Sequence, residues 1–421
     1  MKRLFLIVLS LLVALLSCER VEPEPEENPL KSLSLTTKQS AYAKAGNQFD
    51  FHFIHQLSAQ EPGDWFVSPF GTQLVLGMLL NGARGETAEE IYKVLGYGEG
   101  DTDAVNEYNY ALLQQLPFLD KKVRLLYANA VFADRRTNIK PLYRSTVGHY
   151  YKASVENLDF SKSSSLKKIN DWAKQQTEGL IPEILDKETM QEMQDDAAVL
   201  MSALYFKGEW KWKFQPENTS EEVFHLASGG EKKIPMMKME KNQKHLFRCG
   251  STEYGDFVEI QFGTSNPLSS AFSVNIILPD KKYSLPAIIE MLDTQSLWEM
   301  FQSEHRAMML EVWIPRIELE YSVDLKDILS KMGMDRAFDP NSADFKDMAA
   351  EVREVRSIRQ KATINLNETG VEAATIPYLR MAASGMYDDG IFHADRPFLY
   401  LITENSTGII LFAGAYTGEN Q

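Results

Sequence analysis

The side chains that most often carry chemistry are sparse in this chain and form no catalytic pattern. The seven histidines are His52, His55, His149, His225, His245, His305 and His393. None lies in an HExxH or CxxC pattern, the spacings that bring zinc ligands together. His52 and His55 lie three residues apart on an expected helix and could share one face, but no acidic or cysteine partner accompanies them in the sequence. We therefore predict a surface or half-buried histidine pair and no metal site.

Motifs for a catalytic nucleophile are equally weak. The GxSxG pattern of a nucleophile elbow is absent from the sequence. The stretch SLKK at residues 165–168 matches SxxK, but so short a pattern occurs by chance. The glycines of GYGEG, at residues 96–100, follow an expected helix and so indicate a turn, not a phosphate loop. The sequence therefore predicts no catalytic residue, no cofactor and no enzyme activity.

The charge of the chain argues against a nucleic-acid partner. The formal net charge is −15 and the isoelectric point is about 5.1, whereas phosphate binding needs a basic surface. Residues 232–248 are a lysine-rich exception. They are consistent with a polyanion site, but a solvated strand-and-turn face is the favoured interpretation.

The N-terminal residues differ in composition from the rest of the chain. A basic start is followed by an apolar run over residues 4–16, which is short for a membrane span and typical of a signal peptide. The run ends in LLSC and resembles the bacterial lipobox, which implies diacylation of Cys18 and removal of residues 1–17. The alternative is a plain secretory signal with an incidental cysteine. Since Cys249 is the only other cysteine, no intramolecular disulfide would then form.

Residues 18–37 are expected to form a tether between this anchor and the folded domain. Their core, ERVEPEPEENP at residues 19–29, is rich in proline and glutamate and has almost no apolar side chains. Such a segment buries too little apolar surface to fold. Acidic residues after a lipidated cysteine also resemble the surface-export signals of some Gram-negative lipoproteins.

From residue 38 onward, helical patterns come first and strand patterns follow. Apolar residues recur at helical spacing in residues 42–57, 73–80 and 166–178. Apolar or alternating runs of strand length occupy residues 198–206, 271–278, 310–320, 361–367, 397–402 and 408–412. The run at 310–320 contains a proline, which indicates an edge position or a bulge. This order favours an α+β domain with large mixed sheets.

One long segment without an element of its own separates the last strands. Residues 367–390 read NETGVEAATIPYLRMAASGMYDDG, with small side chains first and a loop-like composition afterwards. Structureless connections longer than roughly 12–15 residues are uncommon in compact domains and usually carry function.

Several stretches together resemble the serpin family, in the order in which that family has them. They lie at residues 47–57, 65–97, 169–185, 202–214, 234–240 and 312–339, with INLNETGVEAAT and FHADRPFLYLITENSTGIILFAGAYTGE closing the set. The resemblance covers residues 38–421. It implies one domain of three β-sheets and about nine helices, with residues 368–391 as an exposed reactive-centre loop.

The resemblance also implies a mechanism. A target serine or cysteine protease attacks one bond of the loop and forms an acyl-enzyme, after which the cut loop inserts into the main sheet as a new strand. The protease is carried along and its active site is distorted. Because deacylation needs a positioned oxyanion hole and general base, the ester is trapped. The intact protein would be held short of its most stable state by kinetics.

The composition of the loop suits insertion, with one exception. The hinge residues implied by the resemblance are Glu368, Gly370, Val371, Glu372, Ala373, Ala374 and Thr375. Side chains that would face the core after insertion are small or apolar; they are Val371, Ala373, Thr375 and Pro377. Those that would face outward are Glu372, Ala374 and Ile376. Pro377 is the exception, because a proline in a central strand loses one hydrogen bond of the ladder. Its alternative role is to stiffen the exposed loop.

Family spacing from Gly370 implies a scissile bond between Ser384 and Gly385. Counting back from Pro397 is less restrictive and allows any position from Ala383 to Met386. Small residues there suit an elastase-like protease, whereas Met386 or Tyr387 would instead attract a chymotrypsin- or subtilisin-like one. The nearest basic residue is Arg380, so a strictly trypsin-like target is disfavoured.

Residues outside the loop match control points of the family. At the top of the main sheet, Glu368 and Arg316 match an ion pair beside Trp210. At the sheet centre the positions of the family's polar latch are Ser68, Gly71, Ser202 and Gln360, of which only Ser68 keeps the usual residue. A buried polar group needs a partner, so Ser202 and Gln360 are expected to bond to each other.

The sequence therefore predicts a monomeric, lipid-anchored inhibitor of serine proteases on the outer membrane or surface of a Gram-negative bacterium, or facing its periplasm. The alternative is a non-inhibitory serpin that acts as a protease substrate or a binding module.

Overall fold

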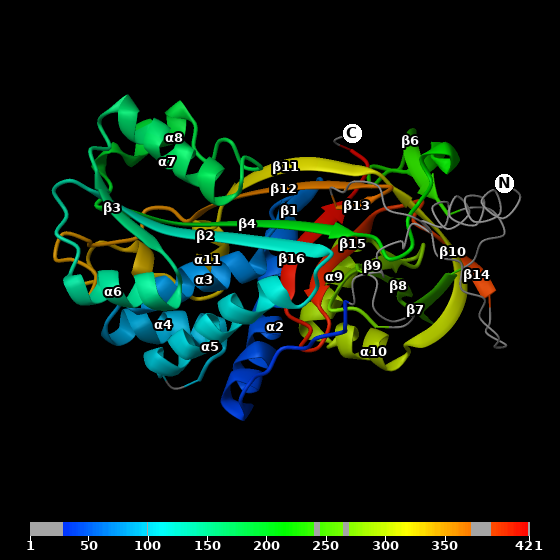
Figure 1. Ribbon diagram of the computed structural model, residues 1–421, viewed down its shortest axis with the longest axis horizontal. Coiled ribbons are helices and arrows are strands. Elements are labelled where there is room, and N and C mark those ends of the chain that lie inside the picture. The colour runs from blue at the N-terminus through cyan, green and yellow to red at the C-terminus, as the bar shows by residue number, and fades with distance from the viewer. Residues whose placement is uncertain (1–27, 99, 240–244, 264–268, 372–388, 420–421) are drawn as a thin grey trace, which may run out of the picture.

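The computed structural model describes residues 28–98, 100–239, 245–263, 269–371 and 389–419. Over these residues the fold is α+β, with ten α-helices packed around two hydrogen-bonded sheets (Figure 1). The described helices are α2 (Thr37–Ser58), α3 (Pro69–Leu80), α4 (Gly85–Leu95), α5 (Thr102–Gln115), α6 (Pro141–Tyr150), α7 (Ser163–Gln176), α8 (Lys187–Glu192), α9 (Leu285–Thr294), α10 (Leu297–Ser303) and α11 (Lys326–Lys331). None of these helices has the length and apolar character needed to cross a membrane.

The six-stranded sheet is the one that positions the candidate site. Its strand order is β11-β12-β13-β4-β2-β3. The strands are β2 (Val123–Asp134), β3 (Ser154–Leu158), β4 (Ala198–Glu209), β11 (Ile317–Asp324), β12 (Arg359–Asn367) and β13 (Gly370–Val371). Helices α7 and α8 lie over one face of this sheet, and α3 lies on the other (Figure 1). All residues of α3 are buried, so this helix forms the centre of the core.

The second sheet has ten strands in the order β1-β16-β15-β9-β8-β7-β10-β6-β5, with β14 pairing β10. They are β1 (Trp65–Val67), β5 (Ser220–His225), β6 (Glu231–Lys238), β7 (His245–Thr252), β8 (Gly255–Gln261), β9 (Phe272–Pro279), β10 (Arg306–Pro315), β14 (Asp389–His393), β15 (Phe398–Glu404) and β16 (Ile410–Tyr416). The paired strands β15 and β16 run through the core with every residue buried.

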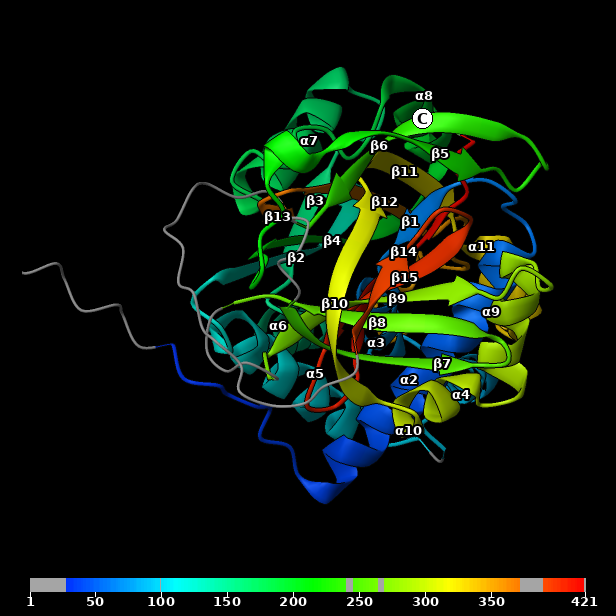
Figure 2. The ribbon, with the colours of Figure 1, turned by 90° about the vertical axis from the view of Figure 1, so that its right-hand side faces the viewer.

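The α+β class with several sheets is confirmed, but hydrogen bonding joins into one what the resemblance implied as two sheets. The joining strand is β10, whose first half pairs β7 and whose last residues pair β6 (Figure 2). A strand that changes partners along its length carries the ladder from one layer into the next. The described sheets therefore number two and not three.

The single strand expected over residues 310–320 is also divided. β10 ends at Pro315, and β11 begins at Ile317 in the other sheet. Between them, Arg316 donates its backbone N–H to the carbonyl oxygen of Pro235 at 3.1 Å. Because proline has no N–H to continue a ladder, Pro315 marks the point where the chain passes between sheets. The other expected helices and strands are confirmed, with ends shifted by a few residues.

Candidate functional site

The short strand β13 lies between two long strands of the six-stranded sheet. Val371 is opposite Leu366 of β12 on one side and Gly208 of β4 on the other. Gly370 has a φ of +141°, and a Cβ atom there would lie 2.0 Å from the carbonyl oxygen of Gly208. Only glycine tolerates this conformation and this approach. Gly370 therefore allows the chain to turn back from β12 and enter the sheet.

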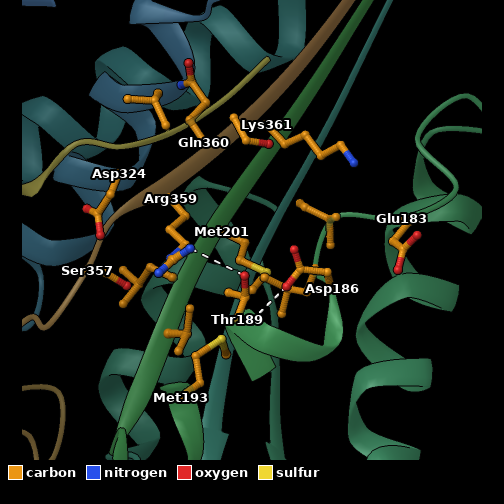
Figure 3. A pocket seen from close by; sticks show the side chains of 16 residues that line it. Glu183, Asp186, Thr189, Met193, Met201, Asp324, Ser357, Arg359, Gln360 and Lys361 are labelled. Carbon is orange, nitrogen blue, oxygen red and sulfur yellow. Dashed lines mark hydrogen bonds between the residues drawn. The ribbon is translucent and has the colours of Figure 1, made fainter. Parts of the chain in front are cut away.

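Beyond Val371 the sheet is open along a seam between β4 and β12. Within the described residues, no backbone pairing joins these two strands directly. A cavity of about 50 Å³ follows Val371 and is lined by Leu204, Phe206 and Thr363 among others. A second cavity, of about 220 Å³, lies farther along between the same strands (Figure 3). The seam therefore has unfilled space along most of its length.

Polar side chains border the larger cavity. Asp186 caps α8 by accepting the backbone N–H of Thr189 at 2.7 Å, and this contact lowers the pKa of Asp186. Arg359 of β12 reaches across to Thr189 (Figure 3). It also pairs with Glu192. These contacts tie the segment around α8 to β12 at the far end of the seam. These contacts are partly exposed, so each stabilises the attachment of the α8 segment to β12 only weakly.

At the near end of the seam, the predicted ion pair is present. Arg316 lies 2.5 Å from Glu368, and its Nε donates to the same carboxylate oxygen at 2.8 Å. Thr219 donates its hydroxyl to that oxygen as well. Burial alone would raise the pKa of Glu368, but the hydrogen bonds from Arg316 and Thr219 outweigh it and lower the pKa. Glu368 is therefore held ionised beside the hinge.

Trp210 closes the same end of the sheet. Its indole N–H donates to the carbonyl oxygen of Asn367 at 2.8 Å, and its backbone N–H donates to that of Thr369. The ring stacks on Phe262 with centroids 4.8 Å apart and is fully buried. Trp210, Arg316 and Glu368 thus surround the point where the chain leaves β12, as the resemblance implied.

The polar latch in the sheet centre is built differently from the expectation. The side-chain oxygen of Gln360 accepts the backbone N–H of Ser68 at 2.6 Å, and its amide donates to the carbonyl oxygen of Ser68 at 2.8 Å. The same amide also contacts the hydroxyl of Thr72. The expected Ser202–Gln360 pair is therefore wrong, because the side-chain oxygen and nitrogen of Gln360 both bond to the start of α3. Thr72 was not recognised from the sequence.

Ser68 itself is the N-cap of α3. Its hydroxyl accepts the backbone N–H of Gly71 and donates to the carbonyl oxygen of Leu411 in β16. A Cβ atom on Gly71 would lie 3.1 Å from Leu204 of β4. The glycine therefore lets α3 pack closely against the strand that borders the seam.

Ser202 is buried without a hydrogen-bond partner among the described residues. Asn129 lies directly opposite on β2, and its side-chain oxygen also has no partner there. Two directly opposed residues of β2 and β4 thus each carry an unsatisfied polar atom. Each costs about 1–3 kcal/mol relative to a satisfied group.

The remaining sequence-predicted site residues lie outside the described residues. They are Cys18, Glu372, Ala373, Ala374, Thr375, Ile376, Pro377, Ala383, Ser384, Gly385 and Met386. The chain is described again from β14, which runs parallel to β10 in the other sheet.

The histidine pair differs from its prediction in one respect. His52 and His55 are partly exposed on α2, as expected, but an acidic partner does accompany them. Asp293 of α9 lies 2.9 Å from the Nδ1 atom of each histidine. The partner was missed because it lies 238 residues beyond His55 in the chain.

Comparison with known proteins shows which family this chain matches over most of its length. A model of the family described as Serpin (serine protease inhibitor) matches residues 44–418. Serpin B6 of Pongo abelii is 28% identical over 383 residues, which cover 89% of this chain and 98% of that protein. The leukocyte elastase inhibitor of Xenopus laevis is 31% identical over 390 residues, with coverage of 89% and 98%. The structure of native protease nexin-1 with heparin is 29% identical, has a TM-score of 0.76, and covers 90% of this chain and 99% of its own.

Proposed function

The chain belongs to the serpin family, and we propose that it is an irreversible inhibitor of serine proteases that traps the acyl-enzyme by loop insertion. The observation that carries this proposal is the seam between β4 and β12, which is open and already contains Gly370 and Val371 at one end. A structure with an unfilled strand position can lower its free energy by accepting the segment that follows Val371 as a new strand.

The register of β13 specifies how the loop would enter. Each further loop residue would move one position back along β12 and one position back along β4. Ala373 would then lie between Ile364 and Phe206, and Thr375 between Ala362 and Leu204. These four neighbours are buried apolar side chains, so small loop residues fit the core face. Each ladder hydrogen bond gained would add about 0.5–1.5 kcal/mol.

The chemistry that precedes insertion is ordinary acyl transfer. The protease serine attacks the carbonyl carbon of Ser384, the peptide bond to Gly385 breaks, and the new amino terminus leaves with the proton from the serine. The resulting ester would be stable only if insertion displaces the protease catalytic groups before water attacks. Cysteine proteases would form the corresponding thioester.

Elastase- or chymotrypsin-like proteases are the proposed targets. The side chains around the scissile bond, Ala383, Ser384 and Met386, are small or unbranched and uncharged. A relative at 31% identity is a leukocyte elastase inhibitor, which supports the same class of target.

The test is to incubate the protein with elastase, chymotrypsin and trypsin and to separate the products on a denaturing gel. We expect an adduct that survives denaturation with elastase or chymotrypsin, and mass analysis of the released peptide should begin at Gly385. A reactive-serine-blocked protease is the control and should give no adduct. Cleavage of the loop with every protease but no adduct would refute the inhibitory proposal.

A non-inhibitory serpin is the second candidate, and one feature favours it. The register of β13 would bring Pro377 between Gln360 and Ser202, at the centre of the sheet. The backbone N–H of Trp210 bonds Thr369, and alternate residues of a strand direct their backbone groups to the same neighbour. Pro377 would therefore face β4 without an N–H to donate to Ser202. Insertion would have to pass this point with one ladder bond missing.

We also propose that the protein is a monomer anchored through lipid on Cys18 and displayed on the outer membrane or surface of a Gram-negative bacterium. The support is the LLSC motif and the acidic, proline-rich tether at residues 19–29. Metabolic labelling with a palmitate analogue should label the wild type and not Cys18→Ser. Equal labelling of both, or of neither, would contradict the anchor.

A further inference from the structure

Two histidines and one carboxylate converge on a single point of the surface, away from the seam. His52 and His55 project from α2, and Asp293 projects from the last turn of α9. The Nδ1 atoms of both histidines lie 2.9 Å from the same oxygen of Asp293. One ligand atom from each of the three side chains lies within 4.8 Å of the others.

The helices that carry these residues are held together by apolar packing. Phe51 and Ile54 are buried next to the histidines on α2, and Ile289 and Leu292 are buried on α9. The ring of Phe51 also packs against Trp298 of α10, with the ring centroids 5.9 Å apart. The three polar side chains are therefore presented from packed helices, which fixes their relative positions without any ligand.

The same arrangement suits a small divalent cation. Zinc binds imidazole nitrogen at about 2.0–2.1 Å and carboxylate oxygen at about 2.0–2.2 Å, so tetrahedral ligands lie roughly 3.4 Å apart. The two 2.9 Å contacts would need to lengthen by about 0.5 Å to admit the ion. Side-chain exposures of 41% for His52, 25% for His55 and 15% for Asp293 leave an approach for the ion and for a completing water.

We propose that His52, His55 and Asp293 form a binding site for a zinc-class divalent cation that braces α2 against α9. Two imidazoles and one carboxylate form a ligand set that suits zinc-class ions. Mg²⁺ and Ca²⁺ instead favour sites made only of oxygen ligands. The site is independent of the proposed inhibitory function, since none of its residues lies on β4, β12 or β13.

The direct test is equilibrium dialysis of the full chain against Zn²⁺ after treatment with a chelator. We expect one saturable site with micromolar or tighter affinity, and His52→Ala, His55→Ala and Asp293→Asn should each weaken binding by at least about tenfold. The matched control is His225→Ala, which removes an exposed histidine that lies 3.4 Å from Glu231 and should leave the affinity unchanged.

A second readout separates loss of a ligand from loss of folding. Co²⁺ in place of Zn²⁺ should give the visible absorption of a four-coordinate site in the wild type and not in His52→Ala, which replaces the most exposed of the three. Zn²⁺ should also raise the apparent Tm of the wild type by roughly 3 °C at one hundred times the Kd. No saturable binding by the wild type, or equal binding by the wild type and the three variants, would overturn the proposal.

Discussion

Gln360 of β12 and Ser202 of β4 lie on the two strands that border the seam, yet they differ in how their polar atoms are satisfied. Gln360 bonds both backbone groups of Ser68, so it links β12 to the first turn of α3. The hydroxyl of Ser202 has no partner among the described residues. The family resemblance identified both positions, but it could not identify the partner of Gln360, which lies 292 residues away in the chain. Hydrogen-bond geometry decides such a pairing, and residue types alone do not.

Substitution of the two residues should therefore have different effects. Gln360→Ala leaves the N–H and carbonyl of Ser68 without these bonds and should destabilise the native state by about 2 kcal/mol. Ser202→Ala removes an unsatisfied hydroxyl and should change stability by less than about 0.5 kcal/mol, or increase it. Apparent Tm values at one fixed scan rate measure both effects. Equal Tm values for the two variants would show that this description of the latch is wrong.

The ion pair at the hinge gives a pH dependence with a definite sign. Because the pKa of Glu368 in the folded protein is below its ordinary value of 4.5, its stabilisation is fully present above about pH 4.5 and is lost as the pH falls through the folded pKa. The apparent Tm of Glu368→Gln should thus be lower than that of the wild type at pH 7. The difference between their Tm values should shrink as the pH falls below about 4.5. A Tm difference that stays constant over this range would contradict the assignment.

At the scale of elements, β13 is the feature that sequence reasoning anticipated least. The alternating pattern of residues 361–367 predicts β12 well, and Gly370 was expected at the hinge. That Gly370 and Val371 already occupy the sheet depends on how far apart tertiary packing holds β4 and β12. Tertiary packing of this kind leaves no local pattern in the sequence.

Replacing the proline in the path of insertion should improve trapping. Pro377→Ala restores one N–H that can bond the carbonyl of Ser202, worth about 0.5–1.5 kcal/mol in the inserted strand. The number of inhibitor molecules consumed per trapped protease should fall as insertion outpaces deacylation. Ile376→Ala is the matched control, because it shortens an outward-facing neighbour and leaves its N–H in place. An unchanged or higher ratio for Pro377→Ala would mean that the proline does not limit insertion.

At the scale of the whole molecule, the two sheets share one core and differ in completeness. The ten-stranded sheet carries the fully buried strands β15 and β16, whereas the six-stranded sheet is open between β4 and β12. The order of helices and strands along the chain was sufficient to predict the α+β class. It was insufficient to predict that β10 joins two layers, because a change of partners within one strand depends on its curvature. An incomplete sheet in a folded protein is the expected basis of a kinetically held native state.

The central claim is that the seam accepts the loop, and the most direct measurement is the apparent Tm before and after cleavage within residues 372–388. Loop insertion would fill the seam and complete the sheet, so the cleaved wild type should melt at least about 10 °C above the intact protein. Thr375→Arg, which would direct a charge toward the core, should lose this gain, whereas Glu372→Arg, which would face outward, should keep it. A cleaved wild type that melts at or below the Tm of the intact protein would contradict insertion and with it the proposed mechanism.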